Sequence, residues 1–255
     1  MHSQSLLTKV ITMNIAESAR KIRLIMYLRS KGISDTDVLS AMEKIPREDF
    51  VVPQMADQAY EDIALPIGRG QTISQPFIVA AMTQALEVEP RDKILEIGTG
   101  SGYQTCVLAQ LCRRVYSIER HKPLLMDAQK MFEKLRLHNI TAIAADGMKG
   151  WPDNGNGGQA PFDKIICTAC ARREPPRALI DQLKDGGIMI IPVAMEDGRQ
   201  ILRRYKKESE DTYAYKDLFD VRFVPLLPEI ATARETERED RYYSQQESHD
   251  GMATV

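Results

Sequence analysis

The 255-residue sequence has no excess of charge of either sign and no long hydrophobic run. Its 34 Lys and Arg nearly balance 36 Asp and Glu, whereas chains that bind nucleic acid usually carry a basic excess. No apolar run approaches the roughly 20 residues that span a bilayer. The N-terminus lacks the apolar core and cleavage site of a signal peptide. We therefore expect a cytoplasmic protein with neither a nucleic-acid nor a membrane partner.

Cysteine is also scarce, with four residues in the chain. Cys167 and Cys170 form a C-x-x-C, a spacing found in redox pairs and in half of a zinc site. A zinc site needs a second pair of ligands, and no histidine is placed to supply a clear one. The motif also follows a strand-like run instead of opening a helix. We predict free thiols in a reducing compartment and no metal site.

The N-terminal third predicts helices followed by a loop. Residues 17–45 show helical spacing, with a break near Gly32, a second N-cap at Ser34 or Asp35 and an end before Pro46. Residues 47–76 have little periodicity and predict a loop. A strongly amphipathic helix is expected to start at Pro76, whose fixed φ suits a first helical turn.

From residue 91 onward, short apolar strands alternate with helices. The expected strands are KILEIG, RVYSIER, ITAIAAD, FDKIICTA and GGIMIIPVA. Strands that are apolar on both faces belong in a parallel sheet with helices on each side. GRQILRRYKKES and YAYKDLFDVRFVPLL follow without a helix between them and predict a closing antiparallel pair. The predicted fold is α/β and Rossmann-like, with a mostly parallel seven-stranded sheet and an N-terminal helical extension.

A glycine loop follows the first strand of this sheet. Gly98, Gly100 and Gly102 lie at the edge where open α/β sheets bind ligands, and glycine lets the backbone approach a ligand closely. The dinucleotide fingerprint G-x-G-x-x-G would need glycine at position 103, where Tyr103 stands. The G-x-G-x-G spacing resembles that of S-adenosylmethionine-dependent methyltransferases, with an NAD site as the alternative.

Three acidic residues fit a nucleoside cofactor. Glu119 ends the second strand, where a carboxylate can accept from both ribose hydroxyls. Asp146 ends the third strand, where it can accept from an adenine amine. Glu96, inside the first strand, needs a charged partner such as a methionine amino group. Each acid could instead cap a helix or face solvent, but their order at successive strand ends favours S-adenosylmethionine.

The stretch GRGQTISQP, residues 68–76, allows two interpretations. It can be a surface turn in which Thr72 or Ser74 caps the following helix. It can also lie across the cofactor and offer hydroxyl groups to an acceptor. Periodicity does not choose between them.

A resemblance does choose. AYEDIALPIGRGQTISQPFIVAAM, ILEIGTGSGYQ, VYSIER, ADG, FDKIICTA and RFVPL, with PREDFV upstream, resemble the protein-L-isoaspartate (D-aspartate) O-methyltransferase family, in collinear order over residues 20–227. The resemblance implies an enzyme that methylates the free carboxylate of L-isoaspartyl (and D-aspartyl) residues in damaged proteins. The ester then closes to a succinimide, and hydrolysis returns some of it to aspartate.

The resemblance also implies site residues by position. Ser74 is the expected catalytic hydroxyl, and Val224, Pro225 and Leu226 in the RFVPL segment are expected to bind the substrate with it. Cofactor contacts are implied for Gln71, Thr72, Ile73, Glu96, Gly98, Gly100, Ser101, Gly102, Glu119, Arg120, Asp146 and Gly147.

The expected organisation is a single catalytic unit that acts as a monomer. Residues 1–76 hold the N-terminal helices and the acceptor-site loop, 77–227 the methyltransferase core, and 228–255 a polar tail that the resemblance does not cover. Arg172 and the glycine-rich segment 152–163 also depart from the family pattern.

The chemistry agrees with a carboxylate acceptor. A carboxylate is ionised at neutral pH and needs no general base, so the enzyme has only to align and partly desolvate it. The loop at 68–76 has hydroxyls but no His, Asp or Lys, which suits such an acceptor better than an amine or an alcohol. Two alternatives stay open: a relative that methylates another carboxylate, and a non-catalytic binding domain.

Overall fold

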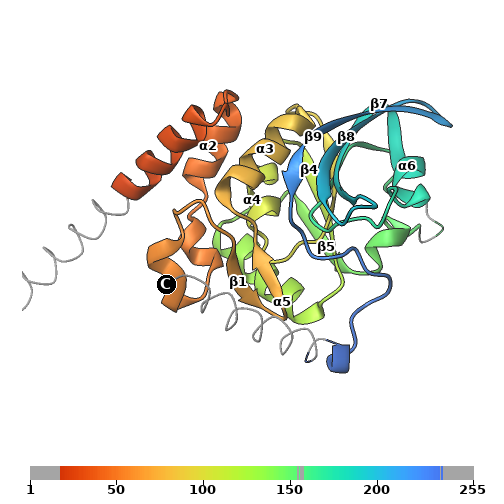
Figure 1. The fold of residues 1–255 in the computed structure, drawn as a ribbon. Helices are drawn as coiled ribbons and strands as arrows, with labels where there is room; N and C mark the ends of the chain where they lie inside the picture. Colours follow the sequence, from red (N-terminus) through yellow and green to blue (C-terminus); the bar gives the residue numbers. More distant parts are fainter. Residues whose placement is uncertain (1–17, 154, 156–157, 236, 238–255) are drawn as a thin grey trace, which may run out of the picture.

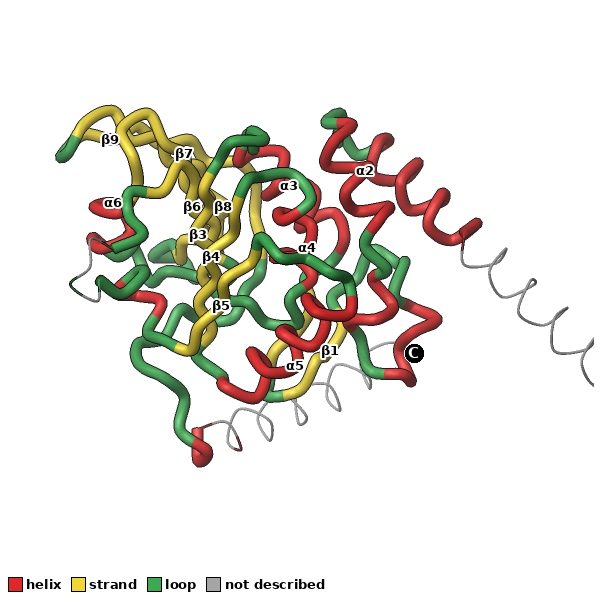
Figure 2. The backbone as a smooth tube through the Cα atoms, turned by 180° about the vertical axis from the view of Figure 1, so that it is seen from behind, coloured by secondary structure: helices red, strands yellow, loops and turns green. Residues whose placement is uncertain are grey.

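The computed structural model describes residues 18–153, 155, 158–235 and 237. Its centre is a seven-stranded sheet in the order β5-β4-β3-β6-β7-β8-β9 (Figures 1 and 2). The strands are β3 (Lys93–Ile97), β4 (Arg114–Glu119), β5 (Ile140–Ala144), β6 (Phe162–Cys167), β7 (Leu183–Ala194), β8 (Gln200–Ser209) and β9 (Thr212–Val221). The strands from β5 to β7 are parallel, and β8 and β9 are antiparallel. The sequence-based prediction of the fold is confirmed.

The strand order creates a switch point at β3. The chain runs from β3 outward through β4 to β5 and then returns to the other side of β3 as β6. The loops after β3 and β6 therefore leave the sheet in opposite directions, which opens a crevice at the carboxyl ends of these strands.

Helices cover both faces of the sheet. They are α2 (Thr36–Lys44), α3 (Pro76–Leu86), α4 (Tyr103–Ala109), α5 (Lys122–Lys134) and α6 (Arg177–Gln182), and residues 18–30 are also helical. In Figure 2, α3, α4 and α5 lie on one side of the sheet and α6 on the other. Side chains alternate accordingly along β3, where Ile94 packs in a cluster with Met82 and Leu108, and Leu95 packs with Leu179.

Residues 47–76 were predicted to form a loop. This prediction was wrong for the two ends of the segment, which contain regular secondary structure. The segment contains two 3₁₀ helices, η1 (Arg47–Phe50) and η2 (Pro53–Gln58), and a hairpin of β1 (Leu65–Gly68) and β2 (Gln71–Ile73). The hairpin turns at Arg69 and Gly70, whose φ angles are 58° and 63°. A two-residue type I′ turn requires positive φ at both central residues. The GRG sequence at residues 68–70 indicates such a turn, but the search for hydrophobic periodicity did not detect it.

The start of α3 also differs from expectation. Pro76 occupies the first turn as predicted, but the N-cap residue is Gln75, and no side chain of the 71–75 loop caps the helix. Instead Oδ1 of Asp62 accepts from the N–H of Phe77 at 2.7 Å. The helix is thus capped from outside its own loop, which leaves the hydroxyls of that loop free for another role.

The four cysteines are free and buried, and burial raises the pKa of Cys167 to about 12 and that of Cys170 to about 11. Thiols held in this form are poor nucleophiles. Over the residues that the structure describes, no helix is long and apolar enough to cross a bilayer.

Candidate functional site

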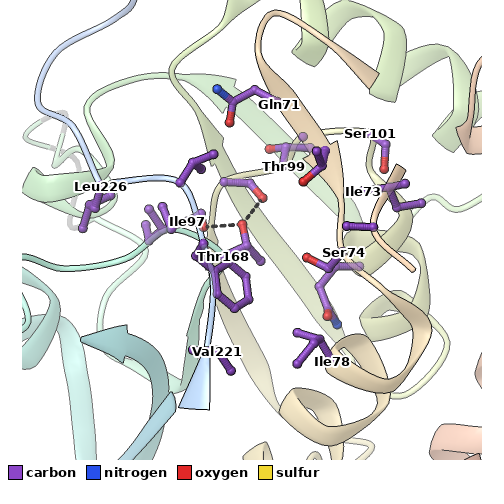
Figure 3. A pocket seen from close by; sticks show the side chains of 18 of the residues that line it. Gln71, Ile73, Ser74, Ile78, Ile97, Thr99, Ser101, Thr168, Val221 and Leu226 are labelled. Carbon is purple, nitrogen blue, oxygen red and sulfur yellow. Dashed lines mark hydrogen bonds between the residues drawn. The ribbon is translucent and has the colours of Figure 1, made fainter. Parts of the chain in front are cut away.

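A cavity of about 1430 Å³ opens at the switch point. Three segments far apart in the sequence form most of its lining: residues 71–79, residues 97–104, and residues 219–227 at the end of β9 and beyond it (Figure 3). Pockets for a single drug-sized ligand are usually about 300–1,000 Å³. This cavity is therefore large enough for two reactants that lie side by side.

Most of the residues implied by the resemblance line this cavity. They are Gln71, Thr72, Ile73, Ser74, Gly98, Gly100, Ser101, Glu119, Arg120, Gly147, Val224, Pro225 and Leu226. Glu96, Gly102 and Asp146 are not among the lining residues.

The glycine loop, residues 98–102, is held against the loop after β6. The hydroxyl of Thr168 donates to the carbonyls of Gly98 at 2.7 Å and Ile97 at 3.1 Å (Figure 3). Gly98 has a φ of 96°, and a Cβ there would overlap the Thr168 hydroxyl. Any side chain at position 98 would therefore displace Thr168 and push the two loops apart.

Glu119 supports the same loop from the next strand. Its carboxylate accepts from the N–H of Gly100 at 2.8 Å and from the N–H of His121 at 2.9 Å. The residue is only 4% exposed, yet it lines the cavity. A carboxylate fixed by two backbone donors keeps further lone pairs for ligand hydroxyls.

Glu96 lies beneath the loop, not in the cavity. It is fully buried, and its Oε2 accepts from Thr105 and Ser117, both at 2.5 Å. Ser117 is in turn hydrogen-bonded to Thr99, which lines the cavity. Burial, against the effect of the two hydroxyl donors, raises the pKa of Glu96 to about 8. The sequence suggested a charged partner for this carboxyl group, but in the structure its partners are two hydroxyl groups.

Gly102 and Asp146 have local structural roles. A Cβ on Gly102 would lie 2.8 Å from the ring of Phe132, so this glycine allows α4 and α5 to pack closely. Asp146 accepts from the N–H of Met148 at 2.9 Å and thereby caps the 3₁₀ helix η3 (Gly147–Lys149). The cavity wall at this place is Gly147.

Ser74 faces the cavity from the opposite wall, across from Thr168 (Figure 3). Its carbonyl accepts from Nη2 of Arg47 at 2.8 Å. Its hydroxyl makes no hydrogen bond to any other described residue. The main chain of Ser74 is therefore fixed, and its Oγ keeps its hydrogen-bonding capacity for a ligand.

The third wall, residues 223–226, is held in place by hydrogen bonds to its main-chain groups. Gln200 exchanges two hydrogen bonds with the main chain of Phe223. The main-chain carbonyl of Cys170 accepts from the N–H of Leu226, and the main-chain N–H of Cys170 donates to the carbonyl of Val224, both at 2.8 Å. The chain itself uses these main-chain groups, so few backbone donors of this wall remain unused.

Several lining residues were not expected from the sequence. They are Thr99, Gln104, His121, Thr168, Gln200, Phe219, Asp220 and Glu235. Thr168 is the one that a signal could have found, because it directly follows a parallel strand that ends at the crevice.

The fold and the cavity define a class, the Rossmann-like α/β methyltransferases. A solved protein-L-isoaspartate O-methyltransferase superposes with a TM-score of 0.71 at 26% identity, over 86% of this chain and 69% of that one. A Plasmodium falciparum protein described as a member of the same enzyme type, in complex with S-adenosyl-L-homocysteine, gives 0.69 at 27% identity, over 80% of this chain and 97% of that one.

The chain belongs to the protein-L-isoaspartate (D-aspartate) O-methyltransferase (PCMT) family, whose model matches residues 19–230. Among similar curated proteins, the protein-L-isoaspartate O-methyltransferase of Rhodospirillum centenum is 55% identical over 85% of this chain and 96% of its own length. That of Paramagnetospirillum magneticum is 57% identical over 83% of this chain and 96% of its own length. The resemblance drawn from the motifs is confirmed.

Proposed function

We propose that this chain transfers a methyl group from S-adenosylmethionine to the free α-carboxylate of L-isoaspartyl residues in damaged proteins, and so initiates repair through a succinimide. One observation carries the proposal. A single cavity has the glycine loop on one wall and the 71–75 loop, with its unused Ser74 hydroxyl, on the facing wall.

The residues at the crevice fit the cofactor. The glycines at 98 and 100 leave the loop without side chains, and the carboxylate of Glu119 is held at the adjacent wall with lone pairs to spare. Ser101, Arg120 and Gly147 complete the residues that would hold it, with Gln71, Thr72 and Ile73 beside them. When bound, the cofactor supplies a methyl group activated on a sulfonium.

Asp146 and Glu96 stay in the proposal with indirect roles. Asp146 fixes Gly147 at the wall by capping η3. Glu96 anchors the hydroxyl of Ser117, and through it Thr99, beneath the glycine loop.

For the acceptor, we assign to Ser74 a hydrogen bond from its Oγ to one carboxylate oxygen. This bond orients the second oxygen toward the methyl group. The 71–75 loop has no titratable side chain, so it offers no base, and a carboxylate needs none. Alignment of the reactants is then the main contribution of the protein. Val224, Pro225 and Leu226 form the wall against which the peptide lies.

The test uses radiolabelled S-adenosylmethionine and two matched peptides, one with isoaspartate and one with normal aspartate at the same position. We expect base-labile methyl ester on the isoaspartyl peptide alone. Equal labelling of both peptides would indicate a general carboxyl methyltransferase, and labelling of neither would overturn the proposal.

Ser74→Ala tests the assigned role. Loss of a hydrogen bond to a charged group costs about 1.5–3 kcal/mol, so we expect kcat/KM for the isoaspartyl peptide to fall roughly 10- to 150-fold. Affinity for S-adenosyl-L-homocysteine, measured by calorimetry, should stay within about twofold. Ser209→Ala, at the end of β8, is the matched control. An unchanged rate for Ser74→Ala would remove Ser74 from the mechanism.

We also propose that the protein acts as a monomer in the cytoplasm. The four buried free thiols suit a reducing compartment. Sedimentation equilibrium at micromolar concentration should give a mass near the chain mass of 28.8 kDa, and twice this mass would contradict the monomer.

A further inference from the structure

Arg47 is a cation with no exposed surface, located where η1 meets the hairpin and α4. Among the residues that the structure describes, no carboxylate forms an ion pair with it, and its Nη1 has no hydrogen-bond partner. Burial lowers the pKa of Arg47 to about 10, so it keeps its charge at neutral pH. The charge of Asp62 acts on Arg47 from beyond ion-pair distance. A buried charge with no ion-pair partner in contact is costly, and apolar side chains often replace such charges with greater stability.

The contacts of Arg47 reach two walls of the cavity. Its Nε donates to the carbonyl of Ala59 at 2.8 Å, and its Nη2 donates to the carbonyl of Ser74 at 2.8 Å. Its guanidinium carbon lies 5.0 Å from the centre of the Tyr103 ring, within range of a cation–π interaction. Tyr103 directly follows the glycine loop and lines the cavity. One side chain thus joins the acceptor wall to the cofactor wall.

Asp62 holds the same loop at its other end. Its Oδ1 accepts from the N–H of Phe77, and its Oδ2 accepts from the hydroxyl of Tyr27 at 3.2 Å. The backbone between Ser74 and Phe77 is therefore fixed by an external donor at one end and an external acceptor at the other.

We propose that Arg47 is a positioning residue for methyl transfer, which sets the distance between Ser74 and the glycine loop by bonding the Ser74 carbonyl while stacking on Tyr103. The inference rests on the proposed role of Ser74. In-line displacement tolerates little misalignment, and a shift of about 1 Å can cost about 100-fold in rate. A residue that bridges the two walls controls this alignment although it does not line the cavity.

The experiment compares Arg47→Met with Lys207→Met. Lys207 is also a buried cation that binds two main-chain carbonyls, those of Ile180 at 3.0 Å and Leu183 at 2.8 Å, on the far side of the sheet. Thermal unfolding of both variants is measured first, so that kcat/KM is compared at a temperature at which each variant is folded. Only Arg47→Met should lose about 10- to 100-fold in kcat/KM for the isoaspartyl peptide, with affinity for S-adenosyl-L-homocysteine within about threefold of wild type.

Equal kcat/KM for the two folded variants, or an equal fall in peptide turnover and in S-adenosyl-L-homocysteine affinity for Arg47→Met, would overturn the inference. If Arg47→Met does not fold, Arg47→Lys decides through a double-mutant cycle with Ser74→Ala. Lysine can reach one carbonyl but cannot reproduce the stacked fork. We expect a fall of at least about fivefold alone and less than about twofold in the Ser74→Ala background.

Equal fold-changes in both backgrounds would mean that Arg47 does not act through Ser74. The proposed function fails separately: in that case the wild-type protein itself would not methylate the isoaspartyl peptide. Methylation by wild type together with matched behaviour of Arg47→Met and Lys207→Met would overturn the role of Arg47 alone.

Discussion

Glu96 is a carboxyl group two positions before the glycine loop, but it lies outside the cavity. Side chains alternate along a strand, so its neighbours Leu95 and Ile97 face the α6 side while Glu96 faces α4. Two hydroxyl groups hydrogen-bond one of its oxygens, and the other has no partner among the described residues. Because burial raises its pKa to about 8, the group is mostly protonated at neutral pH.

Stability should therefore depend on pH through Glu96. Its pKa is raised from 4.5 in the unfolded chain, so the folded state holds a proton that the unfolded state has released. The contribution of the protonated group is complete below about pH 4.5 and is lost as pH rises through about 8. Relative to Glu96→Gln, which does not titrate, wild type should lose on the order of 2 kcal/mol in urea-unfolding free energy between pH 5.5 and 7.5. A difference that does not change with pH would contradict the raised pKa.

At the residue scale, the sequence predicts what local spacing encodes. The glycines at 98 and 100 are readable because composition at a strand end indicates a ligand loop. The role of Ser74 came from the family resemblance, because local spacing left its loop with two interpretations. Gln200 enters the cavity only because β8 closes the sheet beside β7, which no local pattern encodes. Gly102 is the opposite case. Its place in the glycine motif indicates a ligand contact, but in the structure the missing side chain allows α4 to pack closely against α5.

At the element scale, α5 ends in a Schellman motif that is built on an unfavourable residue. The N–H of Leu137 bonds the carbonyl of Phe132 and the N–H of Arg136 bonds that of Glu133, both at 3.0 Å. Arg136 has a φ of 56°, a left-handed conformation that costs a residue with a Cβ about 1 kcal/mol.

Arg136→Gly should remove that strain. We expect a gain of about 0.5–1 kcal/mol, or about 1–4 °C in Tm by differential scanning calorimetry. Arg136→Ala is the control, because it removes the same exposed side chain but keeps the Cβ. A similar gain in both variants would assign the effect to the lost charge and not to the backbone.

The elements themselves were predictable to different degrees. The central strands and α3 follow from apolar runs and from Pro76, because burial on both faces leaves a clear pattern. The β1–β2 hairpin was not predicted, because its strands are short and its turn depends on positive φ at Arg69 and Gly70. The external cap from Asp62 is a tertiary contact that no helix signal contains.

At the scale of the whole molecule, the cavity exists only when three distant segments meet. Residues 71–79 come from the hairpin and α3, residues 97–104 from the sheet centre, and residues 219–227 from the end of β9. A ligand that fills the cavity therefore binds the folded chain and not the unfolded one. Its binding free energy adds to the stability of all three segments together.

This coupling separates the two cofactor interpretations that the sequence left open. S-adenosyl-L-homocysteine at about 100 times its Kd should add about 2.7 kcal/mol, which corresponds to a rise in Tm of roughly 5–11 °C for a chain of this size. NAD at the same concentration should leave Tm unchanged, because Tyr103 replaces the third glycine of a dinucleotide loop. Ser74→Ala should retain the full shift, since its hydroxyl is assigned to the acceptor. A shift with NAD but none with S-adenosyl-L-homocysteine would contradict the assigned cofactor, and loss of the shift in Ser74→Ala would place Ser74 on the cofactor side of the cavity.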